Sequence, residues 1–130
     1  MNREHAQDWL NRYVQAWESY DPAQIGDLFT DNARYRYRPY ERGVTGREEI
    51  VRDWMSHRTP DQSYLAQYTP VAVDGDIVVA VGEVRYLSDD QTAIDRLYDS
   101  LFVLRFADDG RCEELVEWYM QQPVTSEAAE

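Results

Sequence analysis

The stretch YLAQYTPVAVDGDIVVAVGEVRYL, Tyr64 to Leu87, predicts the central part of the fold. Two segments rich in β-branched and aromatic residues, Tyr64 to Val73 and Ile77 to Leu87, flank Asp74-Gly75-Asp76. Glycine beside aspartate between two such segments is a strong hairpin signal, because glycine accepts the positive φ that a tight turn needs. We therefore predict two long antiparallel strands joined by this turn.

The strand pattern continues to the end of the chain. We expect a looser turn over Ser88 to Thr92 and a long strand from Ala93 to Phe106. The turn Asp108-Asp109-Gly110 then leads into a last strand, Arg111 to Gln122. Residues 1–123 form one predicted domain, and residues 124–130 form an acidic C-terminal tail.

Helical patterns occupy the N-terminal part. After a predicted N-cap at Asn2, apolar residues recur at spacings of three and four, which is typical of an amphipathic helix. They are Ala6, Trp9, Leu10, Tyr13, Val14 and Trp17. Asp21 followed by Pro22 predicts a second, short helix, which Thr30-Asp31-Asn32 should end. Thr45-Gly46-Arg47-Glu48 has the pattern of a capping box for a third helix.

An alternating segment lies between the second and third helices. In Arg34-Tyr35-Arg36-Tyr37-Arg38 the residue type changes at every position. Because side chains alternate between the two faces of a strand, we predict a strand over Ala33 to Arg38 with the tyrosines inward and the arginines on the outer face. The whole order predicts an α+β fold, with three N-terminal helices packed on a curved, mostly antiparallel sheet.

Composition limits the kinds of partner. The chain has 130 residues and a net charge of −12, which disfavours binding to nucleic acid or to anionic membranes. No apolar run approaches the roughly 18 residues of a membrane span, and the single cysteine, Cys112, fits a reducing compartment. We therefore predict a cytoplasmic protein. Metal-ligand spacing, a glycine-rich phosphate loop and a Gly-x-Ser-x-Gly motif are absent from the sequence, so we expect neither metal nor cofactor.

Several short segments, in this order, resemble one known superfamily. They are Arg12-Tyr13-Val14, Ile25 to Ala33, Thr45 to Ile50, Phe102 to Phe106 with Asp109-Gly110-Arg111, and Glu117-Trp118-Tyr119. Together they resemble the nuclear transport factor 2-like superfamily, in particular its SnoaL-like or ketosteroid-isomerase-like branch, which includes polyketide cyclases. This resemblance implies a cone-shaped, cystatin-like fold around an apolar pocket. It also implies homodimerisation through the outer sheet face, where we expect Val78, Ala80 and Val84.

The resemblance also suggests which side chains line the pocket. In the strand from Ile77 to Leu87, the side chains on both faces are largely apolar. Hydrophobicity alone therefore does not show which face is inward. The superfamily's register favours the set Ile77, Val79, Val81, Glu83 and Arg85 as inward, together with Ser100, Leu104 and Leu115 from the next two strands. The predicted substrate-binding residues are Tyr13, Trp17, Tyr35, Tyr37, Trp54, Tyr98, Phe102 and Tyr119. The alternative for Trp17, Trp54 and Tyr13 is core packing, which is the more common place for such residues on helices.

Three charged residues are the catalytic candidates: Glu83, Arg85 and Glu117. A carboxylate that is desolvated in a pocket has a raised pKa and can serve as a base, with Arg85 as its partner. The superfamily's epoxide hydrolase uses two acids bridged by an arginine, and Asp99 is a nearby alternate acid. A salt-bridged rim without chemistry remains the alternative reading.

Steroid isomerase activity is disfavoured. Tyr13 falls where that branch has an oxyanion-binding tyrosine, but the position of its base falls at or next to Tyr37, and that of its second donor near Phe102. The polyketide cyclases use a pocket acid or histidine, whereas we expect His5 and His57 on helix faces away from the pocket.

Two functions stay open. The first is a cofactor-independent cyclase, isomerase or hydrolase for an apolar small molecule, with Tyr13 and Tyr37 as hydrogen-bond donors. The second is a non-catalytic small-molecule-binding or protein-interaction module.

Overall fold

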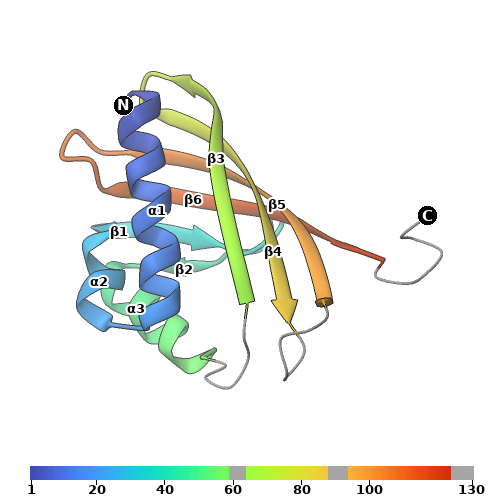
Figure 1. Cartoon of the computed structure of the whole chain (residues 1–130). Coiled ribbons are helices and arrows are strands. Elements are labelled where there is room, and N and C mark those ends of the chain that lie inside the picture. Colours follow the sequence, from blue (N-terminus) through green and yellow to red (C-terminus); the bar gives the residue numbers. More distant parts are fainter. Residues whose placement is uncertain (59–63, 88–93, 124–130) are drawn as a thin grey trace.

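Three helices cover one face of a curved sheet (Figure 1). The computed structural model describes residues 1–58, 64–87 and 94–123. Its helices are α1 (Arg3–Ser19), α2 (Pro22–Asp27) and α3 (Arg47–Ser56). Its strands are β1 (Phe29–Arg36), β2 (Val44–Thr45), β3 (Tyr64–Asp74), β4 (Ile77–Leu87), β5 (Ile94–Phe106) and β6 (Cys112–Gln122). The predicted turn over residues 88–92 and the predicted tail over residues 124–130 lie outside the described residues.

The strands form one sheet in the order β2-β1-β6-β5-β4-β3. Strands β1 and β6 run parallel, with Tyr35 opposite Leu115, and the other neighbouring pairs are antiparallel. This arrangement confirms the predicted α+β fold class. The parallel pairing also places the tyrosine-bearing end of β1 beside the middle of the last strand.

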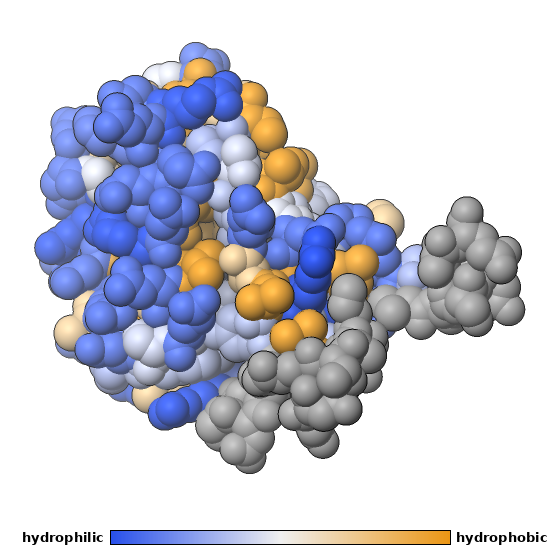
Figure 2. Space-filling view, viewed as in Figure 1, coloured by the Kyte–Doolittle hydropathy of each residue, from blue (hydrophilic) through white to orange (hydrophobic). Residues whose placement is uncertain are grey.

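Helix α1 forms as its sequence predicts. The side chain of Asn2 accepts a hydrogen bond from the backbone N–H of His5, which satisfies one of the free donors at the helix start. The buried face includes Trp9 and Tyr13, and the indole N–H of Trp9 donates to the backbone carbonyl of Leu28 at 3.0 Å. Figure 2 shows that the helix side of the molecule is mostly hydrophilic, as expected for amphipathic helices.

Two local predictions are wrong. Residues Thr30-Asp31-Asn32 do not separate α2 from the next element, because α2 ends at Asp27 and β1 already begins at Phe29. The backbone N–H of Cys112 bonds to the carbonyl of Leu28, so pairing with β6 begins there. The predicted capping box also does not form. The N-cap of α3 is Gly46, with a φ of 101°, and no side chain makes a capping hydrogen bond. Thr45 is instead extended in β2, opposite Arg34.

The predicted inward face of β4 is also wrong. Val78 and Ala80 are fully buried and Val84 nearly so, whereas Val81, Glu83 and Arg85 lie on the outer face. Cross-strand partners share a face of a sheet. Ala80 pairs with Phe102 and Val84 pairs with Tyr98, so the face of β4 follows from its register against β5. The sequence did not determine that register.

Position 82, on the inward face of β4, is occupied by glycine, and a larger residue there would collide with Tyr68. The two residues are cross-strand partners, and a Cβ atom on Gly82 would lie 2.1 Å from the Tyr68 ring. The ring is stacked on Phe102, with the centroids 4.6 Å apart. Glycine at this position therefore lets Tyr68 lie flat across the inner face of the sheet.

We predict that Gly82→Ala lowers the free energy of unfolding by about 1–3 kcal/mol, because the methyl group must displace the Tyr68 ring from a packed core. Urea denaturation of both proteins measures the effect. Gly26→Ala is the matched control: its Cβ would make ordinary contacts no shorter than 3.5 Å, and alanine favours helix α2. Equal stability of Gly82→Ala and the parent would contradict the packing described.

Candidate functional site

An aromatic pocket of about 480 Å³ lies between the helices and the inner face of the sheet. Such a volume is within the range of small-molecule sites. Of the predicted binding residues, the structure brings seven together in its lining: Tyr13, Trp17, Tyr35, Tyr37, Trp54, Tyr98 and Tyr119. Phe102 is fully buried behind Tyr13 and Tyr68 and contributes to the core rather than to the lining.

Tyr13 is the centre of the aromatic packing. Its ring centroid is 5.3 Å from those of Trp54 and Phe102. Its hydroxyl lies 2.7 Å from the hydroxyl of Tyr35, so α1 and β1 are joined by a buried hydrogen bond. Burial raises the pKa of both phenols well above the ordinary value, which keeps both protonated. One of the two hydroxyls donates its proton within the pair, and the proton of the other has no acceptor among the described residues.

Glu117 is the carboxyl group on the sheet wall of the pocket. It projects from β6 into the pocket, and the hydroxyl of Ser100 on β5 donates a hydrogen bond to its Oε2 at 2.7 Å. Burial raises the pKa of Glu117 to about 7, although the Ser100 hydrogen bond and the charge of Arg38 act in the opposite direction. The carboxyl therefore exchanges a proton near neutral pH.

Several tyrosines around Glu117 respond to its charge. Burial is the main cause of the raised pKa of Tyr13, Tyr35, Tyr37, Tyr68 and Tyr86, and the negative charge of Glu117 raises each of these pKa values further. These residues come from α1, β1 and the segment just after it, β3 and β4, so Glu117 lies centrally among the walls of the pocket. The prediction that Glu117 faces inward is confirmed.

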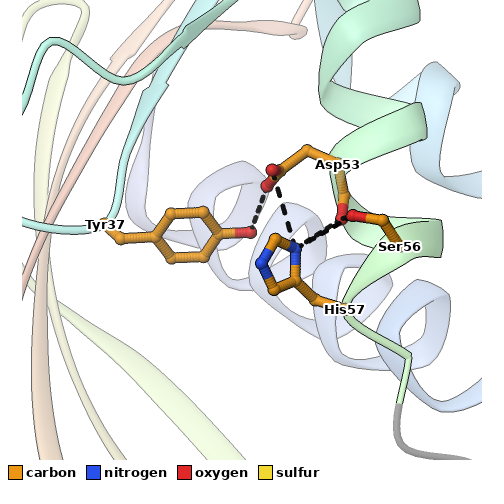
Figure 3. A network of polar contacts seen from close by, with 4 residues as sticks. All are labelled: Tyr37, Asp53, Ser56 and His57. Carbon is orange, nitrogen blue, oxygen red and sulfur yellow. Dashed lines mark hydrogen bonds and ion pairs between the residues drawn. The ribbon is translucent and has the colours of Figure 1, made fainter.

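A polar network connects β1 with the end of α3 (Figure 3). Just beyond β1, Tyr37 donates its hydroxyl proton to Oδ2 of Asp53 at 2.8 Å. Nδ1 of His57 lies 2.8 Å from the backbone carbonyl of Asp53 and 3.6 Å from its Oδ1. Because a carbonyl only accepts hydrogen bonds, Nδ1 is the donor in this contact.

This network changes two predictions. His57 lines the pocket, so the expectation that both histidines lie away from it is wrong for His57, which follows the last turn of α3. Tyr37 lines the pocket as predicted, but its proton is committed to Asp53, so the hydroxyl offers a ligand lone pairs rather than a donor. Trp54 is a different donor: its buried indole Nε1 has no hydrogen-bond partner among the described residues.

The other two catalytic candidates lie outside the pocket. Glu83 and Arg85 form an ion pair on the outer face of β4, with side chains 38% and 50% exposed. The alternate acid, Asp99, is on the same face and accepts a hydrogen bond from Gln122 at 2.7 Å. The predicted cluster with Glu117 therefore does not form, because Glu117 lies on the opposite face of the sheet.

Sequence reasoning missed several lining residues. They are Tyr20, Arg38, Tyr68, Val84, Tyr86 and Arg96. Arg38 was expected on the outer face with Arg34 and Arg36, but β1 ends at Arg36 and the alternation stops there. Gly82 opposite a tyrosine was the available signal for the inward set of β4, because strand glycines often mark a close neighbour.

Within residues 1–58, 64–87 and 94–123, no group of His, Cys, Asp and Glu side chains is arranged to hold a metal ion. In the same part of the chain, no helix has the length and apolar character needed to cross a membrane.

Comparisons with known proteins agree with the fold. A family profile described as SnoaL-like domain matches residues 10–115. A search of curated proteins finds no match. Among solved structures, a domain of unknown function with a cystatin-like fold from Nostoc punctiforme PCC 73102 superimposes with a TM-score of 0.68 at 17% identity, covering 98% of this chain and 81% of that one.

Two further structures are similar at this level. A protein from Mycobacterium tuberculosis has a TM-score of 0.71 and 8% identity, with 94% of this chain and 99% of that one covered. A nuclear transport factor 2-like protein of unknown function from Burkholderia xenovorans LB400 has a TM-score of 0.68 and 15% identity, with 95% and 88% covered. At these identities the likeness shows the fold alone.

We predict that Glu117 makes stability depend on pH. Its raised pKa means that the folded state binds the proton more tightly than the unfolded state, so this stabilisation is complete below the usual value of 4.5 and is lost as pH rises through about 7. Between pH 5 and pH 8 the parent should lose roughly 2 kcal/mol more than Glu117→Gln, which cannot titrate.

Urea denaturation at both pH values measures this difference. Glu113→Gln is the control, because Glu113 is an exposed residue on the same strand. Parallel pH dependences for the parent and Glu117→Gln would show that the Glu117 pKa is ordinary.

Proposed function

The chain belongs to the SnoaL-like domain family, and on that premise we propose that it is a cofactor-independent enzyme that transfers a proton on an apolar small molecule, with Glu117 as its base. The observation that supports this most is the Glu117 carboxyl in a tyrosine-lined pocket. Among the described residues, only Ser100 donates a hydrogen bond to it, at one of its two oxygens. A base of this kind works best when its pKa lies near the operating pH.

The proposed step uses two groups of the pocket. The Glu117 carboxylate removes a proton from a carbon next to a substrate carbonyl, and the electron pair of the broken C–H bond moves into an enolate. The free hydroxyl proton of the Tyr13–Tyr35 pair donates a hydrogen bond to the enolate oxygen. The enolate carbon then attacks a second carbonyl of the same molecule, and protonated Glu117 returns its proton to the alkoxide that forms. Alternatively, where a C=C bond is conjugated with the enolate, protonated Glu117 returns the proton to the far carbon of that bond. These outcomes correspond to a cyclase and an isomerase.

The surroundings of Glu117 favour this chemistry. Removing a base typically costs about 10²–10⁴-fold in rate, and an oxyanion donor contributes about 10²–10³-fold. Ser100, Tyr13 and Tyr35 are all buried, so their hydrogen bonds are formed without competition from bulk water. A hydrolase that uses Glu83 and Arg85 with Glu117 is not proposed, since those two side chains are on the outer face.

We also propose that the protein is a homodimer through the outer sheet face. The residues first expected there, Val78, Ala80 and Val84, are buried in the core instead. The outer face nevertheless has two apolar rows that run across three strands. They are Val81-Leu101-Trp118 and Val79-Val103-Val116. Trp118 is 44% exposed and the nearby Met120 73%, which is unusual for large apolar residues unless they are covered by a partner.

A probe reaction tests the base without knowledge of the substrate. In 5-nitrobenzisoxazole, a base removes the C3 proton, the ring N–O bond breaks and a coloured cyanophenolate forms. We expect the parent to accelerate this reaction, with a rate that rises as pH increases through about 7, because only ionised Glu117 accepts a proton. Glu117→Gln should lower the rate by about 10²-fold or more.

The control for this probe is Glu113→Gln, which changes the net charge equally on the same strand and should keep the parent rate. Equal rates for the parent and Glu117→Gln would remove Glu117 as a base and favour a non-catalytic binding module.

Sedimentation analysis tests the dimer. We expect the parent to sediment as a dimer at micromolar concentration and Trp118→Arg as a monomer, because a buried unpaired charge opposes association. Tyr40→Arg is the control, since Tyr40 is 76% exposed but lies in the segment between β1 and β2. A parent that stays monomeric would contradict the proposed interface.

A further inference from the structure

We propose that the ligand of this pocket is a ring-bearing carboxylic acid. Its carboxylate pairs with Arg38, and Arg96 adds positive charge at the other end of the same tyrosine row. The proposed function says only that the molecule is apolar and small. The inference rests on that proposal only in treating the pocket as the ligand site, and it is independent of whether Glu117 is a base.

Arginines gather at the rim of the pocket. The described residues show three cation–π contacts, and each involves a tyrosine of the pocket lining. The guanidinium carbon of Arg38 lies 5.2 Å from the Tyr119 ring centre and that of Arg96 lies 4.4 Å from the Tyr86 ring centre. The third pair is Arg58 over Tyr20, at 5.4 Å. Arginine is well suited to such stacking and also to bidentate recognition of carboxylate.

This clustering contrasts with the rest of the molecule. The chain has 25 acidic and 13 basic residues, so its surface carries a net negative charge. An anion approaching most of that surface is repelled, whereas the pocket mouth has guanidinium groups on more than one side. The mouth is therefore a place where this acidic protein can accept an anion.

Arg38 retains hydrogen-bonding capacity. Its guanidinium is paired with Glu41 at 3.0 Å and donates to the Tyr119 hydroxyl. A guanidinium has five N–H groups, and these two contacts use only part of them. The same contacts hold the group in place, so less conformational entropy is lost when it binds a carboxylate.

A tyrosine row connects the two arginines. Tyr86 on β4, Tyr98 on β5 and Tyr119 on β6 lie side by side, with 5.9 Å between the ring centres of each neighbouring pair. Arg96 lies over one end of this row and Arg38 over the other. The row is a continuous aromatic wall for a ring system, and the arginines mark where an acidic substituent of that ring system would lie.

The charges around the pocket favour a single negative charge on the ligand. Glu41 already neutralises part of the charge of Arg38, and Glu117 lies deeper, within reach of the electrostatic influence of Arg38. A ligand carboxylate at the mouth would raise the pKa of Glu117 further, because two negative charges in one pocket repel each other. Anion binding should therefore be coupled to uptake of a proton by Glu117.

A matched pair of probes tests the proposal by titration calorimetry: 2-naphthoate and 2-naphthamide, which share one ring system and differ in charge. We expect the parent to bind naphthoate about tenfold more tightly than naphthamide at low salt, with a smaller ratio at high salt. The double variant Arg38→Met/Arg96→Met should reduce the ratio to about one. Methionine keeps much of the apolar stem over the tyrosine rings.

Arg105→Met is the matched control. Arg105 lies at the far end of β5, is exposed and is outside this pocket, so its loss changes the net charge but should keep the preference for naphthoate. A parent that binds both probes equally, prefers the amide or binds neither would overturn the proposal. Retention of the preference in the double variant would also overturn it, because the rim arginines would then not be its source.

The pH dependence separates this inference from the proposed function. Naphthoate affinity should fall between pH 6 and pH 8 as Glu117 ionises, and this fall should disappear in Glu117→Gln. If the benzisoxazole reaction fails while the naphthoate preference persists, the base assignment is wrong and the ligand class stands. If the reaction succeeds and the preference is absent, the ligand class is wrong and the base stands.

Discussion

The hydrogen bond between Tyr13 and Tyr35 is the constraint on which the pocket depends. It joins the middle of α1 to β1 at a point where both residues are buried. A buried hydroxyl without a partner would cost about 1–3 kcal/mol, so the two residues must meet. Their rings are held by Trp9, Trp54 and Phe29. Helix and sheet are therefore separated by the width of aromatic side chains, and the space beyond these rings stays open as a pocket.

The same constraint sets the chemistry of the pocket. A wall of tyrosines is apolar enough to desolvate a carboxyl, yet each phenol has a polar end that needs a partner. Glu117 lies inside this wall with Ser100 as its donor, so burial raises its pKa to about 7. Tyr37 shows the converse case, because Asp53 accepts its proton and leaves the hydroxyl without a donor for the ligand. A pocket tyrosine can therefore donate a hydrogen bond to a ligand only when no neighbouring side chain already accepts its hydroxyl proton.

The sequence allowed us to predict the helices, the hairpin at Gly75 and the inward side of β1, since each depends on a local pattern or on one strand's alternation. The inward sides of β5 and β6 were expected from the resemblance to the superfamily. The inward face of β4 could not be predicted, because Val79 and Val78 are equally apolar and the choice depends on pairing with β5. His57 was missed for a similar reason. A residue that follows the end of a helix is placed by the packing of that whole helix, which a periodicity within α3 does not specify.

The position of Glu117 is best understood from its neighbours in the sheet. On β6 it lies between Val116, at 5% exposure, and the exposed Trp118, and it pairs with the buried Phe102 across to β5. A leucine at this position would pack against Phe102 and the tyrosines of the inner face without a desolvation penalty. The fold itself therefore does not need a carboxyl there. Residues that lower stability without a structural benefit are typical of functional sites, and this one is hydrogen-bonded by Ser100 within a tyrosine-lined pocket. The burial of this carboxyl thus supports the proposal that Glu117, rather than the exposed pair of Glu83 and Arg85, is the reactive group.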